Sequence, residues 1–150
     1  SSVSSRASIE RQEGYEDAFK KAHIAVNPSY IETSTAWHIQ AGYEGAKKLL
    51  SRNSDLTAVF CANDTIAFGL IKYCNEVGIV IPDQLSIIGF DDDRISSYIN
   101  PPLTTFRQNK EIIAELAADI LLQAISGFPT PAVIRVPTKF IIRNSVRTLK

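Results

Sequence analysis

Polar side chains follow two apolar stretches of the sequence, each at the point where a buried strand would end. Three consecutive carboxylates, Asp91–Asp93, come directly after the stretch Leu85–Phe90, and Asn63 with Asp64 comes after the stretch Thr57–Ala62. In parallel α/β sheets, ligands bind beyond the carboxyl ends of the strands. Because carboxylate and amide groups accept or donate hydrogen bonds, this edge is predicted to be a binding site, and the residues themselves leave open what binds there.

Catalytic chemistry is disfavoured by the arrangement of these residues. Consecutive side chains diverge in an extended segment, so Asp91–Asp93 do not converge on one divalent cation as a hydrolase requires. His23 and His38 lie in or beside helical segments, and no Ser/His/Asp pattern surrounds them. A response-regulator receiver needs an acidic pair near its first strand and a lysine on its last, and neither pattern is evident. We therefore predict a binding protein that is not an enzyme and uses no cofactor or metal.

The composition fits one globular core without a strongly charged partner. The chain has 150 residues, 45% of them hydrophobic, and a formal net charge of zero, so no global field draws it to nucleic acid or to an anionic membrane. No acidic residue follows Asp119, whereas five basic residues do: Arg135, Lys139, Arg143, Arg147 and Lys150. Because these bases alternate with strand-like apolar residues, we predict a solvated strand face rather than a basic binding arm.

The two cysteines indicate a reducing compartment. Cys61 falls in a predicted strand and Cys74 in the helix after it, and neither has metal-ligand spacing to the other or to a histidine. Two buried free thiols fit a cytoplasmic protein. No apolar run reaches the roughly 18 residues that span a bilayer, and no signal peptide is evident. The sequence lacks methionine and opens on several serines, so we expect a piece of a longer protein.

Helices and strands alternate along the chain. Helices are predicted over 8–22, 37–52, 65–77 and 110–126, and strands over 29–32, 57–62, 85–90, 132–136 and 138–142. Asp64 is expected to cap the third helix and Gly78 to end it. A turn is predicted at Pro82–Asp83, and tandem prolines make 96–102 a loop. Strands alternating with helices predict an α/β fold, with a parallel sheet flanked by helices.

Several motifs in register resemble one protein family. They are Arg11 with Gly14-Tyr15, Gly42-Tyr43 with Leu49-Leu50, Ala62-Asn-Asp64, Gly78 with Pro82-Asp83, Ser86-Ile-Ile-Gly-Phe-Asp-Asp92, Pro101-Pro-Leu-Thr-Thr-Phe-Arg-Gln108 and Ile141-Ile-Arg143-Asn-Ser145. Over nearly all of its length, the chain resembles the C-terminal half of the effector-binding domain of LacI/GalR-family bacterial transcription regulators.

The resemblance implies a periplasmic-binding-protein-like domain, in which two α/β lobes hold a ligand between them. It implies that residues 1–105 form the C-terminal lobe, that 106–128 cross to the N-terminal lobe and supply one of its helices, and that 129–150 return as terminal strands. Most of the N-terminal lobe, and a helix-turn-helix that enters the DNA major groove, are expected to lie outside this chain.

The resemblance also implies ligand contacts and a dimer surface. The matching ligand-binding positions are Arg11, Trp37, Asn63, Asp91 and Gln108, and the dimer-interface positions are Phe68 and Tyr98. An arginine fork suits vicinal oxygens, and an indole packs on a sugar face. Plainer alternatives are a surface arginine for Arg11, an edge-of-core anchor for Trp37 and a core position for Phe68. Lys110 is not the aromatic or apolar residue that some members have nearby.

The helix predicted over 110–126 carries a broad apolar stripe at helical spacing. The stripe comprises Ile112, Ile113, Leu116, Ala117, Ile120, Leu121 and Ala124. Because the strands that it would cover are largely absent, the stripe needs cover from its own lobe or from another copy. We expect exchange between copies, with Thr104–Gln108 acting as a hinge.

The implied function is effector sensing in a cytoplasmic homodimeric repressor. Such a fragment binds a sugar or nucleoside in the interlobe cleft, contacts no membrane, and reaches DNA only through the N-terminal domain. The alternative is a periplasmic sugar-binding protein of a transport system, which shares the fold. The unpaired cysteines and the lack of a secretory segment disfavour that alternative. The effector's identity, its role as inducer or co-repressor, and the operator do not follow from the sequence.

Overall fold

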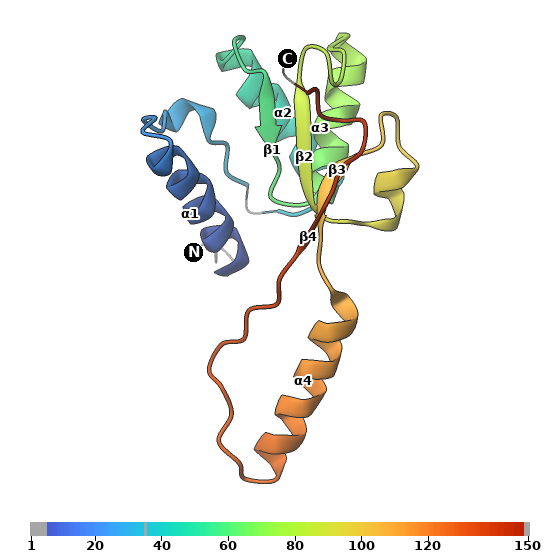
Figure 1. The fold of residues 1–150 in the computed structure, drawn as a ribbon. Helices are drawn as coiled ribbons and strands as arrows, with labels where there is room; N and C mark the ends of the chain where they lie inside the picture. The colour runs from blue at the N-terminus through green and yellow to red at the C-terminus, as the bar shows by residue number, and fades with distance from the viewer. Residues whose placement is uncertain (1–5, 35, 149–150) are drawn as a thin grey trace.

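A four-stranded sheet lies at the centre of the chain, whose computed structural model describes residues 6–34 and 36–148 (Figure 1). The strands are β1 (Ala58–Phe60), β2 (Ser86–Asp91), β3 (Thr104–Arg107) and β4 (Lys139–Ile141), in the order β1-β2-β3-β4. The first three are parallel, and β4 runs antiparallel to β3. The predicted α/β fold with a parallel sheet is confirmed, and β4 adds an antiparallel edge.

Four α-helices flank or leave this sheet, at the places that the sequence predicts. They are α1 (Arg6–Lys21), α2 (Ile39–Arg52), α3 (Asp64–Val77) and α4 (Lys110–Ile125). Gly78 ends α3 in the left-handed conformation, with φ 79°, and its N–H donates to the Cys74 carbonyl. The N-cap of α3 is Asn63, whose side-chain oxygen accepts from the Ile66 N–H at 2.8 Å. The prediction that Asp64 caps this helix is therefore wrong.

Two predicted strands and the predicted hinge need correction. Residues 29–32 do not form a strand: the short 3-10 helix η1 (Pro28–Tyr30) leads into an extended segment, where Arg52 donates to the carbonyls of Ser29 and Ile31. Residues 132–136 form no strand either. Conversely, β3 lies in the segment expected to be a hinge, because Thr104 and Thr105 are fully buried between β2 and β4.

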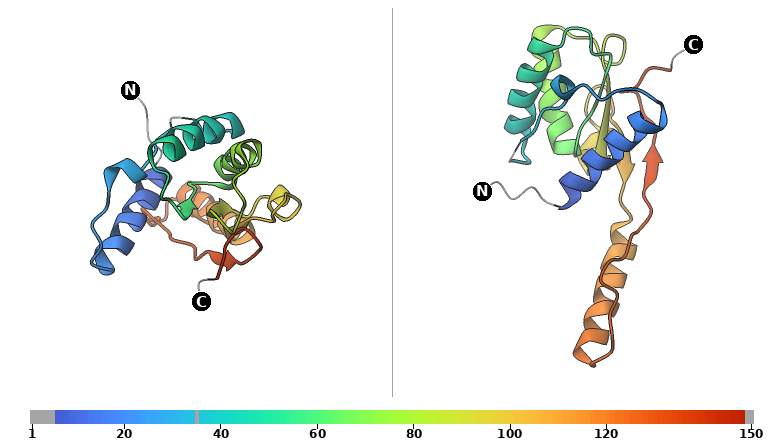
Figure 2. Two further views of the ribbon diagram at one scale, coloured as in Figure 1. Left: turned by 90° about the horizontal axis from the view of Figure 1, so that it is seen from above. Right: turned by 90° about the vertical axis from the view of Figure 1, so that its left-hand side faces the viewer.

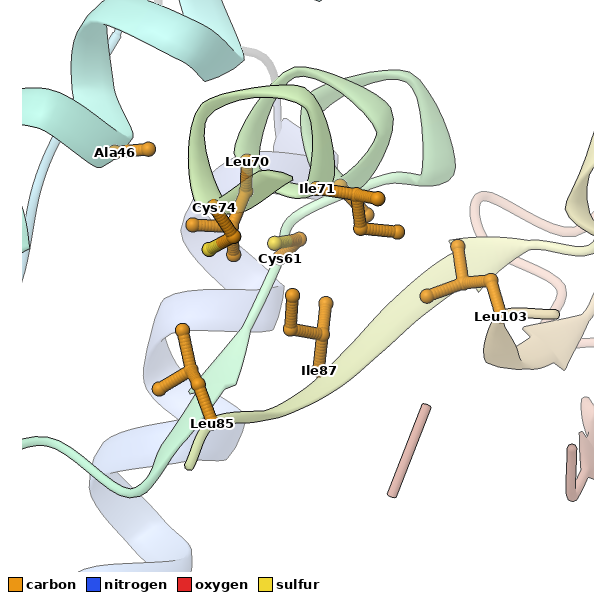
Figure 3. Packing of buried hydrophobic residues seen from close by; sticks show 9 residues of the cluster. Ala46, Cys61, Leu70, Ile71, Cys74, Leu85, Ile87 and Leu103 are labelled. Atoms are coloured by element: carbon orange, nitrogen blue, oxygen red, sulfur yellow. The ribbon is translucent and has the colours of Figure 1, made fainter. Parts of the chain in front are cut away.

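The hydrophobic core lies between the sheet and α3 (Figure 3). Leu85, Ile87 and Leu103 are almost completely buried, and burying such a side chain contributes roughly 1.5–3 kcal/mol. The free cysteines Cys61 and Cys74 belong to the same cluster, as predicted. Burial raises the pKa of the Cys61 thiol to about 12 and that of Cys74 to about 11, so both thiols are inert at neutral pH.

Helices α2 and α3 pack backbone to backbone. A Cβ placed on Gly42 would lie 2.2 Å from the Ile66 carbonyl oxygen, and one on Gly69 would lie 2.1 Å from the Ile39 carbonyl oxygen. Only glycine permits this approach of the two helices. Helix α3 also contacts β2, and its first residue, Asp64, binds the Asp93 N–H just beyond the carboxyl end of that strand.

Helix α4 projects away from the sheet with the segment that follows it (Figures 1 and 2). None of its residues is buried, and Leu121, Leu122 and Ile125 are 60%, 63% and 74% exposed. Within the described chain, α4 has therefore not folded back onto its own lobe. Across residues 6–34 and 36–148, no helix has the length and apolar character needed to cross a membrane.

Candidate functional site

Three of the five predicted ligand-binding residues meet directly at the carboxyl end of β2. The Gln108 amide nitrogen donates a hydrogen bond to Asp91 Oδ1, and Arg11 Nη2 lies 3.8 Å from the same oxygen. Asp91 ends β2, Gln108 follows β3, and Arg11 comes from α1. Residues separated by up to 97 positions thus form one polar cluster, because the parallel strands end at the same edge of the sheet.

Arg11 is held in place on several sides. Its Nη1 donates to the Ala62 carbonyl at 2.6 Å, and its guanidinium carbon lies 4.0 Å from the ring centroid of Phe90 and 5.6 Å from that of Trp37. The side chain is only 17% exposed. Burial lowers the pKa of Arg11 below its ordinary value, and the nearby Asp91 carboxylate opposes this shift. A freely solvated surface arginine does not have this geometry.

Asp91 is a partly buried carboxylate. Burial raises its pKa above the ordinary range, whereas the Gln108 hydrogen bond and the charges of Arg11 and Lys110 act to lower it. The contacts of Asp91 recorded among the described residues fall on Oδ1. The Asp91 side chain is 30% exposed, and a carboxylate oxygen can accept further hydrogen bonds from a bound molecule.

Trp37 lies beside Arg11, whereas the side chain of Asn63 is committed in part to the cap of α3. Trp37 is 37% exposed beside the Arg11 guanidinium, so part of its indole faces solvent. Asn63 is 6% exposed, and its side-chain oxygen is committed to the α3 cap. The Asn63 side chain was predicted to offer a ligand both a donor and an acceptor. Among the described residues its amide nitrogen has no hydrogen-bond partner, so only the donor remains for a ligand.

A mainly apolar cavity of about 930 Å³ lies beside the polar cluster. It separates the extended segment 31–34 from β1, and its lining includes Tyr15, Phe19 and Leu49. Arg11 and Trp37 also line it, whereas Asp91 and Gln108 do not. The cavity and the cluster are therefore neighbouring features that share one wall.

Asp64 is a buried carboxylate whose hydrogen bonds hold the segments around the site together. The sequence prediction missed this role. It is 1% exposed, and its carboxylate accepts hydrogen bonds from the Asp93 N–H at 2.8 Å and from the hydroxyls of Ser96 and Thr105 at 2.6 Å each. A Cβ on Gly89 would lie 2.2 Å from Asp64 Oδ1. A side chain at Gly89, in the Ile-Gly-Phe-Asp motif, would therefore clash with the Asp64 carboxylate. This glycine was the feature of the sequence that could have indicated a buried group beside it.

Asp92 and Arg143 form a second charged group that was not foreseen. Arg143 Nη2 donates to Asp92 Oδ1 at 2.6 Å, and Arg107 Nε donates to Asp92 Oδ2 at 2.5 Å. Burial by itself would raise the Asp92 pKa, but hydrogen bonds and charges from both arginines outweigh burial and lower it. Arg143 is 16% exposed, so the predicted solvated basic face is wrong at this position.

The predicted dimer surface is a shallow groove beside an exposed loop. Phe68 packs in part against the core and lines the groove together with Ile71, Lys72, Asn75, Glu76, Ile99 and Asn100. Tyr98, which follows the 3-10 helix η2 (Arg94–Ser97), is 87% exposed, and Ile95 is 53% exposed. Large apolar side chains are thus presented to solvent next to α3.

The chemistry available at the Asp91 cluster is recognition. Arginine, amide and carboxylate groups lie beside two aromatic rings, and the opposite charges of Arg11 and Asp91 offset one another. Over residues 6–34 and 36–148, no group of three or more histidine, cysteine or acidic side chains is arranged to hold a metal ion. Such a cluster suits a small, polar, uncharged molecule with several hydroxyl groups.

The chain is similar to known proteins over nearly all of its length. Residues 1–146 match the family model of the periplasmic binding protein-like domain. The chain is 37% identical over 143 residues to the HTH-type transcriptional repressor PurR of Haemophilus influenzae (strain PittEE), and 38% identical over 143 residues to the Ribose operon repressor of Haemophilus influenzae (strain ATCC 51907 / DSM 11121 / KW20 / Rd). Each match covers 93% of this chain and 42% of the relative, so the chain spans less than half of their length.

A solved structure shows the same fold. It is a sugar-binding transcriptional regulator of the LacI family from Escherichia coli, complexed with phosphate, with a TM-score of 0.85 and 32% identity. The match covers 96% of this chain and 51% of that one. The described elements therefore recur together within a longer regulatory protein.

Proposed function

Because the chain belongs to the family of periplasmic binding protein-like domains, in the form found in LacI-type transcriptional regulators, we propose that it senses a small effector for such a regulator. The observation that carries the proposal is the cluster of Arg11, Asp91 and Gln108 beside the Trp37 and Phe90 rings. These groups make hydrogen bonds and stacking contacts, and none of them is arranged as a nucleophile with its base. The proposed role is therefore binding without catalysis.

The proposed effector is a neutral polyol, such as a sugar or a nucleoside. Arg11 already has a carboxylate 3.8 Å away, so a phosphate or carboxylate on the ligand would meet repulsion from Asp91. Hydroxyl groups can donate to Asp91, and the partly exposed Trp37 indole offers a face for sugar C–H groups or for a base. One relative is named as a repressor of a ribose operon, which supports a ligand of this class.

Regulation would operate through lobe orientation and dimerisation. We propose that this chain forms a homodimer through Phe68 and Tyr98, and that DNA is bound by an N-terminal helix-turn-helix outside these residues. Effector binding then changes DNA affinity to the extent that the effector prefers one lobe arrangement over the other. The cytoplasm is the proposed location, since repressors act on DNA there, and the names of the relatives favour this role over transport.

Isothermal titration calorimetry on the full-length protein tests the effector class. D-ribose and adenosine are titrated in parallel with ribose 5-phosphate and adenosine monophosphate. We expect a neutral compound to bind at least about tenfold more tightly than its phosphorylated counterpart, a difference of about 1.4 kcal/mol. Tighter binding of the phosphorylated compounds, or no binding by either class, would contradict the proposed neutral ligand.

A further inference from the structure

We propose that Asp92 is a positioning residue. Its hydrogen bonds with Arg107 and Arg143 hold the backbone so that the neighbouring Asp91 faces the ligand. This inference rests on the proposed function, since it concerns the same site. It assigns a purpose to a buried charged group that makes no contact with the Arg11 cluster itself.

The backbone at the end of β2 is held in an uncommon conformation. Asp91 has φ 120° and Asp92 has φ 50°. Residues with a Cβ rarely adopt positive φ, and two in succession persist only where surrounding contacts hold them. The chain therefore needs restraints at this point. The Asp93 N–H is held by Asp64 on one side of the turn, and the contacts of Asp92 restrain the turn itself.

Both carboxylate oxygens of Asp92 are engaged. Arg143 binds Oδ1 and Arg107 binds Oδ2, and the Asp92 side chain is only 6% exposed. Arg143 is itself anchored, because its Nη1 donates to the Leu103 carbonyl at 2.7 Å and its N–H donates to Thr104 Oγ1 at 2.9 Å. Asp92 is thus fixed to β3 and to the residues that follow β4.

Two consecutive residues at the end of β3 bind the two carboxylates. Asp91 is the register partner of Arg107 across the β2–β3 pair, yet Arg107 binds Asp92 and Gln108 binds Asp91. This crossed pairing differs from the alternation of an extended chain, which the positive φ angles of Asp91 and Asp92 interrupt. Release of Asp92 would let this turn relax and carry Asp91 away from Gln108 and Arg11.

The hydrogen bonds of Asp92 also connect the site to the projecting helix α4. Arg107 ends β3, which leads out to α4, and Arg143 lies just after β4, which returns from it. Both segments that carry α4 are therefore attached to the residue next to Asp91. A displacement of the Asp91–Asp92 turn would therefore act on both segments that carry α4.

The carboxyl titration of Asp91, followed by NMR in the full-length protein, tests the proposal without any ligand. Arg143→Gln removes a positive charge, which by electrostatics alone would raise the Asp91 pKa. If the Asp92–Arg143 contact positions Asp91, the same variant exposes the Asp91 carboxyl group to water, and the raised pKa of Asp91 falls toward its ordinary value. We expect the fall, accompanied by unchanged chemical shifts in α2 and α3.

A control variant separates the loss of charge from the loss of the Asp92 contact. Lys139 is paired with Arg107 in β4 and has no recorded contact with Asp92. Lys139→Gln removes an equal charge and should leave the Asp91 pKa unchanged within experimental error. Arg107→Gln, in a side chain that is 52% exposed, provides the same measurement if Arg143→Gln does not fold. A pKa of Asp91 that rises or stays constant in the arginine variants would overturn the positioning role. Failure of the polyols to bind would refute the proposed ligand and leave this test unaffected.

Discussion

At the scale of single residues, Asp91 places function in conflict with stability. Its pKa is raised, chiefly by burial. A carboxyl group whose folded-state pKa is raised contributes stability that is present below its unfolded pKa and is lost as the pH rises through the folded value. At neutral pH, keeping Asp91 ionised therefore costs folding free energy, and a binding role would account for its presence.

Substitution of Asp91 should separate binding from stability. Charged hydrogen bonds contribute roughly 1.5–3 kcal/mol each, so Asp91→Ala or Asp91→Asn should weaken effector binding about tenfold or more in the full-length protein. The free energy of unfolding of Asp91→Asn at pH 7 should equal or exceed that of the wild type. Calorimetry and urea unfolding measure the two quantities, and Asp83→Asn, on an exposed turn, is the control.

The same group predicts how binding depends on pH. Affinity should decline as the pH falls through the raised Asp91 pKa, because the protonated carboxyl group accepts hydrogen bonds less well. Asp91→Asn should remove that dependence. If affinity for the effector were the same in wild type and Asp91→Ala, Asp91 would not belong to the binding site.

At the scale of elements, one buried carboxylate connects the ligand edge to the proposed dimer surface. Asp64 begins α3, binds the N–H of Asp93 and the hydroxyl of Ser96 in η2, and reaches Thr105 in β3. It thereby fixes the loop that presents Tyr98. The ligand edge and the exposed loop are attached to a common support, although Tyr98 itself faces solvent.

Dimerisation is best tested at Tyr98. Because this side chain is 87% exposed, Tyr98→Ser should leave the fold intact while weakening a dimer that buries the ring. Light scattering over a concentration series measures the effect. The control is Val80→Ser, at a 52% exposed residue just before the turn 81–84. Phe68→Lys tests the adjacent groove, although Phe68 also packs against the core. A folded dimer that survives both changes would place the interface elsewhere.

At the scale of the whole molecule, α4 has an apolar surface without a partner. No residue of this helix is buried among the described residues, and five of its large apolar side chains are exposed: Ile112, Ile113, Leu121, Leu122 and Ile125. Covering each such side chain is worth roughly 1.5–3 kcal/mol, and the sum is comparable to the stability of a typical domain. A partner for this surface is therefore strongly favoured.

A polypeptide of these 150 residues alone should associate through α4. Exchange of the helix between copies, with β3 kept in its own sheet, would cover the stripe, so the sedimentation coefficient should rise with concentration. Leu121→Glu together with Ile125→Glu should abolish this rise, while Lys110→Gln at the start of the helix should preserve it. A strictly monomeric wild-type polypeptide whose α4 amides resist hydrogen exchange would show instead that the helix docks within its own chain.

The sequence by itself determined the helices, the parallel sheet and the family. Local patterns can be recognised in the sequence alone. They include the helical periodicity, Gly78 at the end of a helix, and the apolar stretches that lead to Asn63 and Asp91. The resemblance to the family, and not a local pattern, pointed to Arg11 and Gln108, which the structure brings to Asp91.

Only the tertiary structure decided the roles that depend on distant partners. Asp64 and Asn63 are both acceptable helix caps in the sequence, and the choice depended on hydroxyl donors in η2 and β3. Asp92 and Arg143 lie 51 residues apart, so no local pattern pairs them. Residues 29–32 form no strand: the cavity lies between them and β1, and the carbonyls of Ser29 and Ile31 accept hydrogen bonds from Arg52 instead of from a partner strand. In each case, the deciding energy is a contact between segments far apart in the chain, and only folding brings those segments together.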